Sequence, residues 1–435
     1  MRNNFLKNRN KRFVGFLLIN LILISFLFWS FPASACGCGL MISQSDDGWS
    51  YGDDSAEQSF INFENGTEKL IITLNLKKRS KDAVLVIPIP ANPKLIKADV
   101  LSDVPKFSGY NVSKKAHENL SSIRDALLST QIYPIVPILL KSSISTSYVG
   151  GANSRDGALL NAPTKGINQD IVVYQHLEKE GMVAEVLSAA TSDALYDYLK
   201  QKGLKVEKDS IPIFRDYINK EFSFVVSWIS PSASADSAKG LQMNFPAKKI
   251  FYPLKPGSAY PGDGMEKIIN VVGFVSPKLY SDIKNATKVD YFYSEIPSSF
   301  KDFSSSGKKF GFTKIVVKAA PKKLTQDLYI SKNTPFKITN AQLINFHPFI
   351  YGLILLIVFS FISTYLALRF SFMGTAQASA SMAKLGIFSC FTLIGAIIGS
   401  FVFLKEKRFK FIISFSLVFV TVTLIISFLI SLLYK

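Results

Sequence analysis

The sequence predicts an α+β protein with mainly antiparallel strands and a few short helices, followed by a C-terminal transmembrane helical region. Three observations lead to this fold class. The middle of the 435-residue chain carries many short stretches in which apolar and polar residues alternate, as they do in half-buried strands. Three stretches there follow the helical period instead. Residues 346–435 hold long apolar runs with few charges.

The N-terminus has the layout of a secretory signal, which we assign to residues 1–35. Five basic residues and no acid precede an apolar run from Phe13 to Phe31. Ala33-Ser34-Ala35 comes next, and the small-x-small rule places cleavage after Ala35. Because the run is long for a signal, an uncleaved anchor is the alternative. In both cases the basic end stays in the cytoplasm, and the chain beyond the apolar run is exported.

Residues 36–141 are predicted to form a β-rich N-terminal half of the exported domain. Asn65-Gly66 lies between two strand-like stretches and is a strong signal for a two-residue hairpin turn. The run Ala83–Pro90 ends in Pro-x-Pro, which prevents it from continuing as a central strand. Residues 114–128 have apolar side chains at helical spacing, and we expect a helix there.

Residues 142–170 are rich in Ser, Gly and Asn and predict a long loop, and residues 171–345 predict an α+β second half. Strands are expected around residues 171–174 and 183–187. A short amphipathic helix is expected over 192–202, with Gly203 as its stop. Pro212 suits the first turn of a second helix. Further strands are expected near residues 222–228, 241–245, 249–252, 268–275, 289–293, 314–317 and 328–331.

The region 346–435 predicts three transmembrane helices, over residues 348–368, 385–404 and 411–433. The middle run contains Gly395 and Gly399 at GxxxG spacing, a pattern that lets helices pack closely, although glycine is also common in membrane helices generally. None of the three runs contains Asp or Glu. Since ion and proton pathways use ionisable groups inside the membrane, we expect an anchor rather than a transporter.

Three spans create a conflict over charge. If the middle of the chain is exported, three spans place Lys405–Lys410 outside, with four bases and one acid. Basic loops favour the cytoplasm. A re-entrant middle segment, with Lys405–Lys410 in the cytoplasm, is therefore the alternative.

Cys36 and Cys38 lie just after the cleavage site and form the candidate disulfide or redox pair, since the third cysteine, Cys390, lies in a predicted span. A strained Cys36–Cys38 disulfide is the first interpretation. Lipidation of Cys36 is the second, weakened because Ala33 stands where a lipobox usually has Leu. A metal or a disulfide partner on another chain is the third, with the two thiols as a soft-metal chelate.

Several stretches of the exported region carry a resemblance together. They are Ala35-Cys36-Gly37, VIPIPANP, AEVLSAATSDALYDYLKQKGL, IPIFRDYINK, FSFVVSW and LQMNFPAKKIFYPLKP, in this order. With them the chain resembles a bacterial family of secreted or membrane-attached proteins of unknown function, whose members begin the mature chain with Ala-Cys-Gly and have a strand that ends in a Val-Pro-x-Pro type run. The resemblance covers residues 36–274; the long Ser/Gly-rich insertion and the C-terminal segments depart from it. It implies location and architecture, not chemistry.

Catalytic motifs give no positive signal. His117-Glu118 lacks the second histidine of a zinc-protease helix, and His176 is expected in a surface turn. His347 is expected at the membrane edge. The net charge of +18 comes from scattered lysines without the arginine and aromatic stripe of a nucleic-acid site. We therefore expect no nucleic acid, no cofactor and no resident metal.

The sequence as a whole predicts a multi-pass cell-membrane protein whose main domain is extracytoplasmic. Its partners would be the lipid bilayer and an unidentified envelope or surface component. A non-enzymatic surface-binding or envelope-organising role is favoured over an enzyme. The alternative is a redox or metal-handling protein that uses Cys36 and Cys38.

Overall fold

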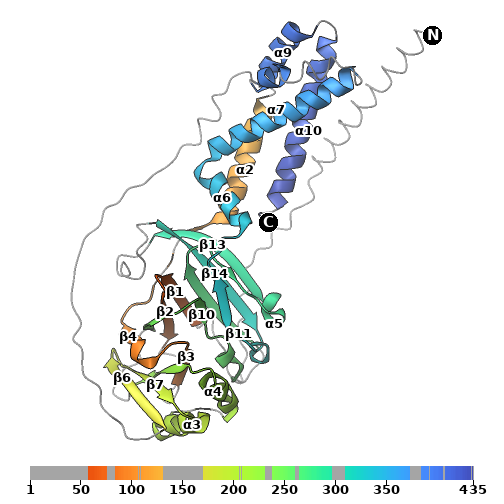
Figure 1. Cartoon of the computed structure of the whole chain (residues 1–435). Helices are drawn as coiled ribbons and strands as arrows, with labels where there is room; N and C mark the ends of the chain where they lie inside the picture. Colours follow the sequence, from red (N-terminus) through yellow and green to blue (C-terminus); the bar gives the residue numbers. More distant parts are fainter. Residues whose placement is uncertain are drawn as a thin grey trace, which may run out of the picture. The chain divides into compact units, whose positions relative to one another are not determined.

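The computed structural model of the chain describes most of the region from residue 57 to the C-terminus (Figure 1). The described residues separate into two compact units. The β unit comprises the described parts of residues 40–111 and 150–335, and the helical unit those of 112–149 and 336–435. Residues 1–56, and with them the predicted signal, lie outside the described residues. The described residues are 57–75, 84–105, 107, 109–130, 170–204, 206, 208–230, 238–259, 264–295, 309–372, 384–390, 392–404, 407–432 and 434.

The described strands form three sheets, which confirms the α+β class. The large sheet has the strand order β4-β9-β2-β1-β11-β14-β13-β5, and β1–β11 is its parallel pair. Its strands are β1 (Glu57–Glu64), β2 (Thr67–Asn75), β4 (Lys97–Leu101), β5 (Gly109–Asn111), β9 (Ala238–Pro246), β11 (Met265–Val272), β13 (Thr287–Glu295) and β14 (Lys309–Ala319).

A second sheet has the order β3-β8-β7-β6 and is antiparallel throughout. It contains β3 (Val84–Ile89), β6 (Ile171–Lys179), β7 (Met182–Ala189) and β8 (Ser223–Ile229). Strand β3 contains Pro88 and lies at the edge of this sheet, as the Pro-x-Pro run predicted. The third sheet has the order β10-β15-β12 and contains β10 (Ile250–Tyr252), β12 (Ser276–Pro277) and β15 (Leu328–Ser331).

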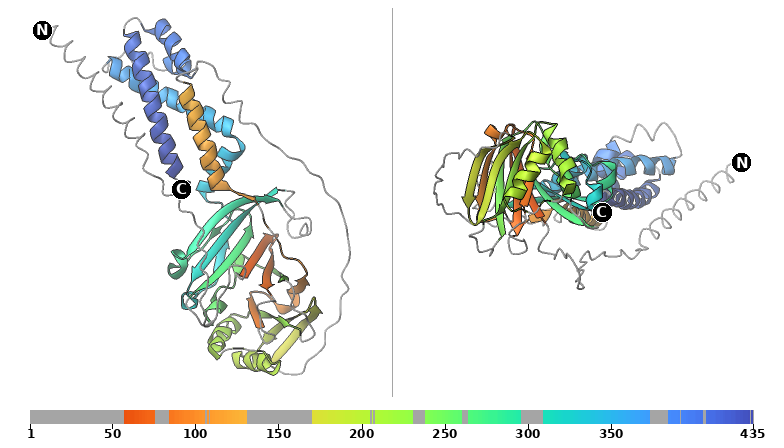
Figure 2. Two further views of the ribbon diagram at one scale, coloured as in Figure 1. Left: turned by 180° about the vertical axis from the view of Figure 1, so that it is seen from behind. Right: turned by 90° about the horizontal axis from the view of Figure 1, so that it is seen from below.

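The β unit is layered (Figure 2). Buried side chains of the large sheet, such as Ile61 and Met243, share one hydrophobic core with Ile87 and Val225 of the four-stranded sheet. On the other face of the four-stranded sheet, α3 (Ser192–Gln201) and α4 (Ile211–Ile218) form a second core. A further short helix, α5 (Ser281–Lys284), precedes β13.

Local signals in the sequence explain where these elements begin and end. Helix α3 starts where the Thr191 side chain accepts a hydrogen bond from the backbone N–H of Ala194. It ends before Gly203, whose φ is +77°. Helix α4 has Pro212 in its first turn. All three features agree with the sequence prediction.

The helical unit contains α2 (Val112–Ser129), α6 (Phe336–Phe346), α7 (Pro348–Phe372), α9 (Thr392–Phe403) and α10 (Arg408–Leu432). Helix α2 is the predicted helix of the N-terminal half, and its apolar face packs in the helical unit and not in the β unit. Helices α7 and α10 are each long and apolar enough to cross a membrane.

The predicted middle span, residues 385–404, is not a single helix. Residues 384–389 are helical, residue 390 lies in a turn, and α9 covers only Thr392–Phe403. An α-helix rises 1.5 Å per residue, so α9 reaches roughly 18 Å, less than the roughly 30 Å of a bilayer core. The structure thus contains two candidate spans among its described residues where the sequence predicted three.

Replacement of Gly66 by Ala tests the β1–β2 turn. Asn65 and Gly66 have φ values of +50° and +76°, which the two-residue turn requires. A Cβ at Gly66 would meet open space, so the expected loss of about 1–2 kcal/mol in unfolding free energy is conformational. Chemical unfolding of the full-length protein in detergent measures it. Gly264→Ala, also in open space but without positive φ, is the control and should cost nothing. Equal effects of the two substitutions would contradict this account.

Candidate functional site

Of the residues that the sequence analysis selected, the cleavage and cysteine residues lie outside the described part of the chain, whereas the two glycines lie within it. Ala35, Cys36 and Cys38 lie outside the described residues, and their roles in cleavage and in a disulfide or redox pair stay predictions. Gly395 and Gly399 lie on α9. A Cβ built at Gly399 would come within 3.0 Å of the Phe388 Cβ atom, so the backbone there approaches the helix of residues 384–389 closely. The joint packing role of the two glycines stays a prediction.

A buried carboxylate on β7 gathers the densest polar cluster of the β unit. The side chain of Glu185 is 3% exposed. Its Oε1 lies 2.8 Å from Nδ1 of His176 on β6, and its Oε2 accepts a 2.6 Å hydrogen bond from the Tyr198 hydroxyl on α3. The Lys202 ammonium donates to Oε1 at 3.4 Å. These donors supply the polar contacts that a buried carboxylate needs in place of water. We call these four residues the Glu185 cluster.

Aromatic rings complete the surroundings of Lys202. Its Nζ lies 5.3 Å from the centre of the Tyr198 ring and 5.7 Å from that of Trp228 on β8. Burial and the hydrogen bond to Glu185 hold the pKa of Tyr198 well above its usual range, so the phenol stays a donor. The Glu185 cluster therefore joins α3 to two strands of the four-stranded sheet, with His176 42% exposed at its edge.

The position of His176 corrects the sequence interpretation. We expected a surface turn, but His176 lies within β6 and directly opposite Glu185 on β7. The turn comes later, at Glu180-Gly181, where both residues have positive φ. The signal that could have found this pairing is the spacing itself, because residues 176 and 185 lie at similar distances from Gly181. The turn sets this register, and the irregularity in the ladder between Val173 and Gln175 shifts only the pairs beyond it, which include Val173 and Leu187.

A second polar network joins α4 to β15. The Tyr217 hydroxyl donates a 2.6 Å hydrogen bond to Asp327, which also accepts the backbone N–H of Lys255 at 3.1 Å. Asp216 forms ion pairs of 2.7 Å with both Lys220 and Lys255. Burial raises the pKa of Asp327, and its two hydrogen bonds oppose that rise. The network fixes helix α4 on the aromatic core beneath it.

Glu68 on β2 is the most deeply buried acid of the described chain that carries a pKa shift. It accepts a 2.9 Å hydrogen bond from the backbone N–H of Phe251. Its other oxygen, Oε1, is buried without a hydrogen-bond partner among the described atoms. Burial raises the pKa of Glu68 well above its usual value, so the carboxyl tends to hold a proton inside the fold.

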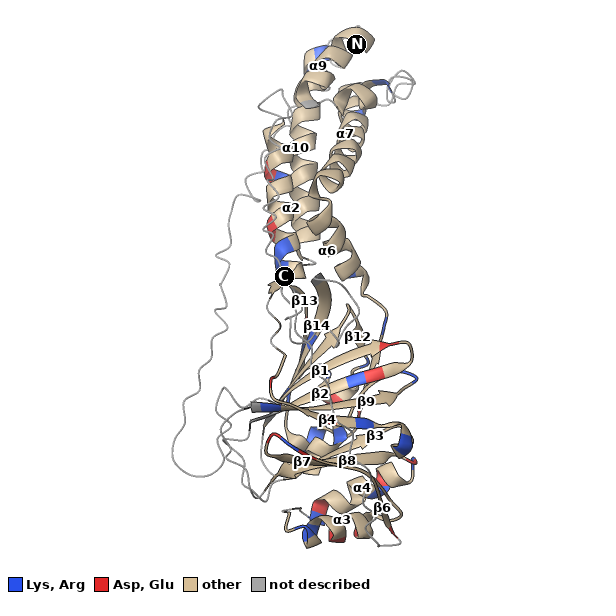
Figure 3. Ribbon diagram, turned by 90° about the vertical axis from the view of Figure 1, so that its left-hand side faces the viewer, with Lys and Arg blue, Asp and Glu red and all other residues tan. Residues whose placement is uncertain are grey.

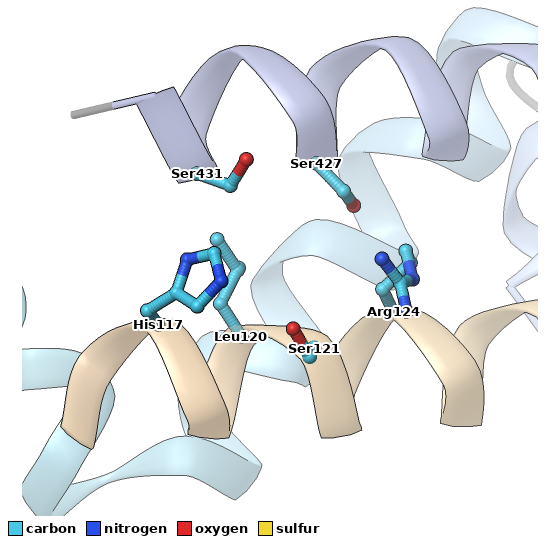
Figure 4. A pocket seen from close by; sticks show the side chains of 6 residues that line it. All are labelled: His117, Leu120, Ser121, Arg124, Ser427 and Ser431. Atoms are coloured by element: carbon cyan, nitrogen blue, oxygen red, sulfur yellow. The ribbon is translucent and has the colours of Figure 1, made fainter. Parts of the chain in front are cut away.

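A small cavity in the helical unit lies between α2 and α10 (Figure 4). His117 and Arg124 of α2 face Ser427 and Ser431 of α10 across it (Figure 4). Arg124 is already paired with Asp125 at 2.8 Å. The cavity volume is about 70 Å³. Because ligand pockets for organic molecules measure roughly 300–1,000 Å³, this cavity fits only a few waters or one small ion.

The polar groups of the Glu185 cluster and of the network around Asp327 bond to one another, whereas Glu68 Oε1 and His117 Nδ1 are buried without a partner among the described atoms. Among the described residues, no group of three or more His, Cys, Asp or Glu side chains is placed to hold a metal ion. The Glu185 and Asp327 clusters have buried carboxylates with several donors each, which is the pattern of groups that hold elements in place. His176, Lys202 and Trp228 are each partly exposed at the surface of the β unit.

Comparisons with known proteins give one family. A family model described as "Uncharacterized protein conserved in bacteria (DUF2330)" matches residues 32–261. A search of curated proteins gives no match. Among solved structures, two of a mutated baculovirus P35 after caspase cleavage align at 13% and 10% identity. They cover 64% and 68% of this chain and 100% and 97% of theirs, with TM-scores of 0.27 and 0.24. Scores this low carry no argument about fold or function.

Removal of the Tyr198 hydroxyl tests the Glu185 cluster. Tyr198→Phe deletes a donor to a buried carboxylate, and we expect a loss of about 1.5–3 kcal/mol in unfolding free energy. Thermal or chemical unfolding of the full-length protein measures it. Tyr196→Phe, on the same helix but outside the cluster, is the matched control and should change stability little. If the control is as costly, the hydrogen bond to Glu185 does not hold α3.

The buried Glu68 predicts a pH dependence of stability. Unfolded Glu68 titrates near 4.5, and the folded carboxyl titrates higher. The contribution of Glu68 to the unfolding free energy is therefore fully present below pH 4.5, and it is lost as the pH rises through the pKa of the folded carboxyl. Glu68→Gln removes this titration, so the melting temperature of the variant relative to the parent should increase from pH 4 to pH 8. Asp197→Asn, an exposed acid on α3, should show no such trend. A constant difference for Glu68→Gln would show that the folded carboxyl is not protonated.

Proposed function

The chain belongs to a family of uncharacterized proteins conserved in bacteria, whose model covers residues 32–261, and on this premise we propose that it is a membrane-anchored protein whose β unit stands outside the cytoplasm as a binding or envelope-organising domain. Helices α7 and α10 form the anchor. The molecule acts by presenting a surface and not by catalysis.

The observation that carries the proposal is the inverted polarity of α7 and α10. Hydroxyl side chains such as Ser363 and Thr423 are fully buried, while large apolar side chains such as Ile357 and Phe428 are exposed. A water-soluble helix pair has the opposite arrangement. In lipid, apolar side chains face the acyl chains, and small and hydroxylated residues pack between helices. Only 33% and 39% of the two apolar windows is buried, unlike the core helices of a soluble protein.

The positions of the charged residues in α7 and α10 support a membrane anchor rather than a transport path for ions or protons. The charged residues of α7 and α10 are Arg369, Arg408 and Lys410, all at the ends of the helices (Figure 3). The interior of both helices is free of ionisable acids and bases. Transport paths for ions or protons place such groups inside the membrane.

The orientation and the binding role rest on the sequence and on the β unit. The basic N-terminus before the apolar run of residues 13–31 supports export of the chain beyond that run. The edges of the four-stranded sheet are blunted by Pro88 on β3 and by the Gln175 side chain of β6, which bonds to the backbone of Ala98. Such edges suit a domain that stays soluble and recognises partners through side chains.

A lysine on the exposed face of α7 tests the anchor. In a membrane, Ile357→Lys places a charge in lipid and should weaken insertion by about 2.5–3.5 kcal/mol, visible as protein lost from carbonate-washed membranes. In a soluble protein the same exposed substitution would be harmless. Leu95→Lys, an exposed apolar position in the β unit, is the control and should leave membrane retention unchanged. Parent protein released by carbonate would contradict the proposal.

A further inference from the structure

The described residues 384–390 and 392–404, which lie between α7 and α10 in the chain, pack against one another. The ammonium of Lys384 lies 5.8 Å from the ring centre of Phe403. The rings of Phe388 and Phe403 have centres 5.4 Å apart. A Cβ at Gly399 would also touch Phe388. Residues near 384 and near 404 therefore meet, and we call the described residues between 384 and 404 the return hairpin.

A segment whose ends meet returns to the side from which it started. Neither part of the return hairpin is long enough to cross a bilayer core on its own. In a membrane, the two ends of the return hairpin, at residues 384 and 404, therefore lie on one and the same side.

The pairing of α7 with α10 leads independently to the same arrangement. The rings of Phe359 and Phe419 lie 6.3 Å apart. Asn340 of α6, just before α7, donates a 2.8 Å hydrogen bond to the Tyr434 hydroxyl, just after α10. The start of α7 thus lies beside the end of α10, and the two helices are antiparallel. Arg369, near the end of α7, and Arg408, at the start of α10, then lie at the same end of the helix pair.

That end carries basic and aromatic groups in contact. The guanidinium of Arg408 lies 5.1 Å from the ring centre of Phe401, and the Phe401 and Phe409 rings are 6.4 Å apart. Phe401 is 48% exposed and Phe409 73% exposed. From residue 348 onward the sequence contains a single acid, Glu406, so the bases of this region are in excess. We call Arg369, Lys384 and Arg408 the basic rim.

We propose that the return hairpin lies at the cytoplasmic face of the membrane and that the basic rim binds the headgroups of anionic phospholipids. Exposed aromatic rings at the level of basic groups are the arrangement of a membrane–water interface. Each basic residue near an anionic leaflet adds roughly a fivefold preference for the surface. This topology also places the basic loop Lys405–Lys410 in the cytoplasm and so removes the conflict that three spans create. The inference rests on the proposed membrane anchor.

Single-cysteine labelling tests the return hairpin. In a full-length chain with Cys36, Cys38 and Cys390 changed to Ser, one cysteine is placed at position 384, 407 or 337. An impermeant maleimide should label Lys337→Cys in intact spheroplasts, and Lys384→Cys and Lys407→Cys only after permeabilisation. Labelling of 384 and 407 from opposite sides would overturn the proposal, because the segment would then cross the membrane. Carbonate extraction of the same membranes separates this failure from a failure of anchoring.

Lipid-dependent stability tests the basic rim. For purified full-length protein in detergent, added dioleoyl phosphatidylglycerol should raise the melting temperature by several degrees more than dioleoyl phosphatidylcholine does. R369Q/K384Q/R408Q should lose this difference, whereas R369K/R408K, which keeps the charges, should retain it. K248Q/K278Q/K284Q, which removes three exposed lysines of the β unit, is the matched control and should behave as the parent.

Three results would overturn the lipid assignment. They are a parent protein that does not distinguish the two lipids, a lipid difference that survives in R369Q/K384Q/R408Q, and an equal stabilisation by inorganic phosphate. If the triple variant does not fold, the test uses R369K/R408K and the single variants R369Q and R408Q. R369K/R408K should keep the difference in melting temperature between the two lipids, and each single Gln variant should reduce it in part.

Discussion

The parallel pairing of β1 with β11 is the constraint on which the β unit depends. It joins residues 57–61 to residues 267–271, so that segments from the two ends of the unit lie in the middle of one sheet. Strand β2 then brings β9 and β4 to one side of this pair, and β14 brings β13 and β5 to the other. Ile61 and Ile269 are fully buried there and lie in the core shared with the four-stranded sheet. Without this pairing the large sheet would be two separate antiparallel pieces.

Elements encoded by a few adjacent residues could be predicted from the sequence. The turn at Asn65-Gly66, the end of α3 at Gly203 and the start of α4 near Pro212 each depend on backbone conformations that particular residues favour. Strand β8 could be predicted from its alternating apolar residues, since Phe224 and Val226 pack in the core beneath α3 and α4. Contacts between distant segments have no such local signal. Neither the β1–β11 pairing nor the packing of α2 with the C-terminal helices is visible in any short stretch of sequence.

The polar clusters show the same limit. His176 and Tyr198 are unremarkable in sequence, and only the register of β6 on β7 and the placement of α3 bring them to Glu185. The prediction of a third span over residues 385–404 depends on hydropathy. Hydropathy sums apolar residues and carries no signal for the turn at residue 390 or for the contact of Lys384 with Phe403. The polar cluster around Glu185 and the packing of residues 384–404 both depend on tertiary contacts, which a local sequence pattern does not show.

The two ends of α7 and α10 are held by different interactions. At the end where α7 starts, amide and hydroxyl groups bond to one another: Asn119 to Asn345, Asn345 to the backbone of Val112, and Asn340 to Tyr434. The Lys337 ammonium also lies there, 5.9 Å from the centre of the Tyr434 ring. At the other end the Arg408 guanidinium lies over the Phe401 ring. Because both ends carry basic groups, the side chains of the helical unit alone select no direction of insertion. The proposed orientation therefore depends on the basic N-terminus before the apolar run of residues 13–31 and on the basic loop Lys405–Lys410.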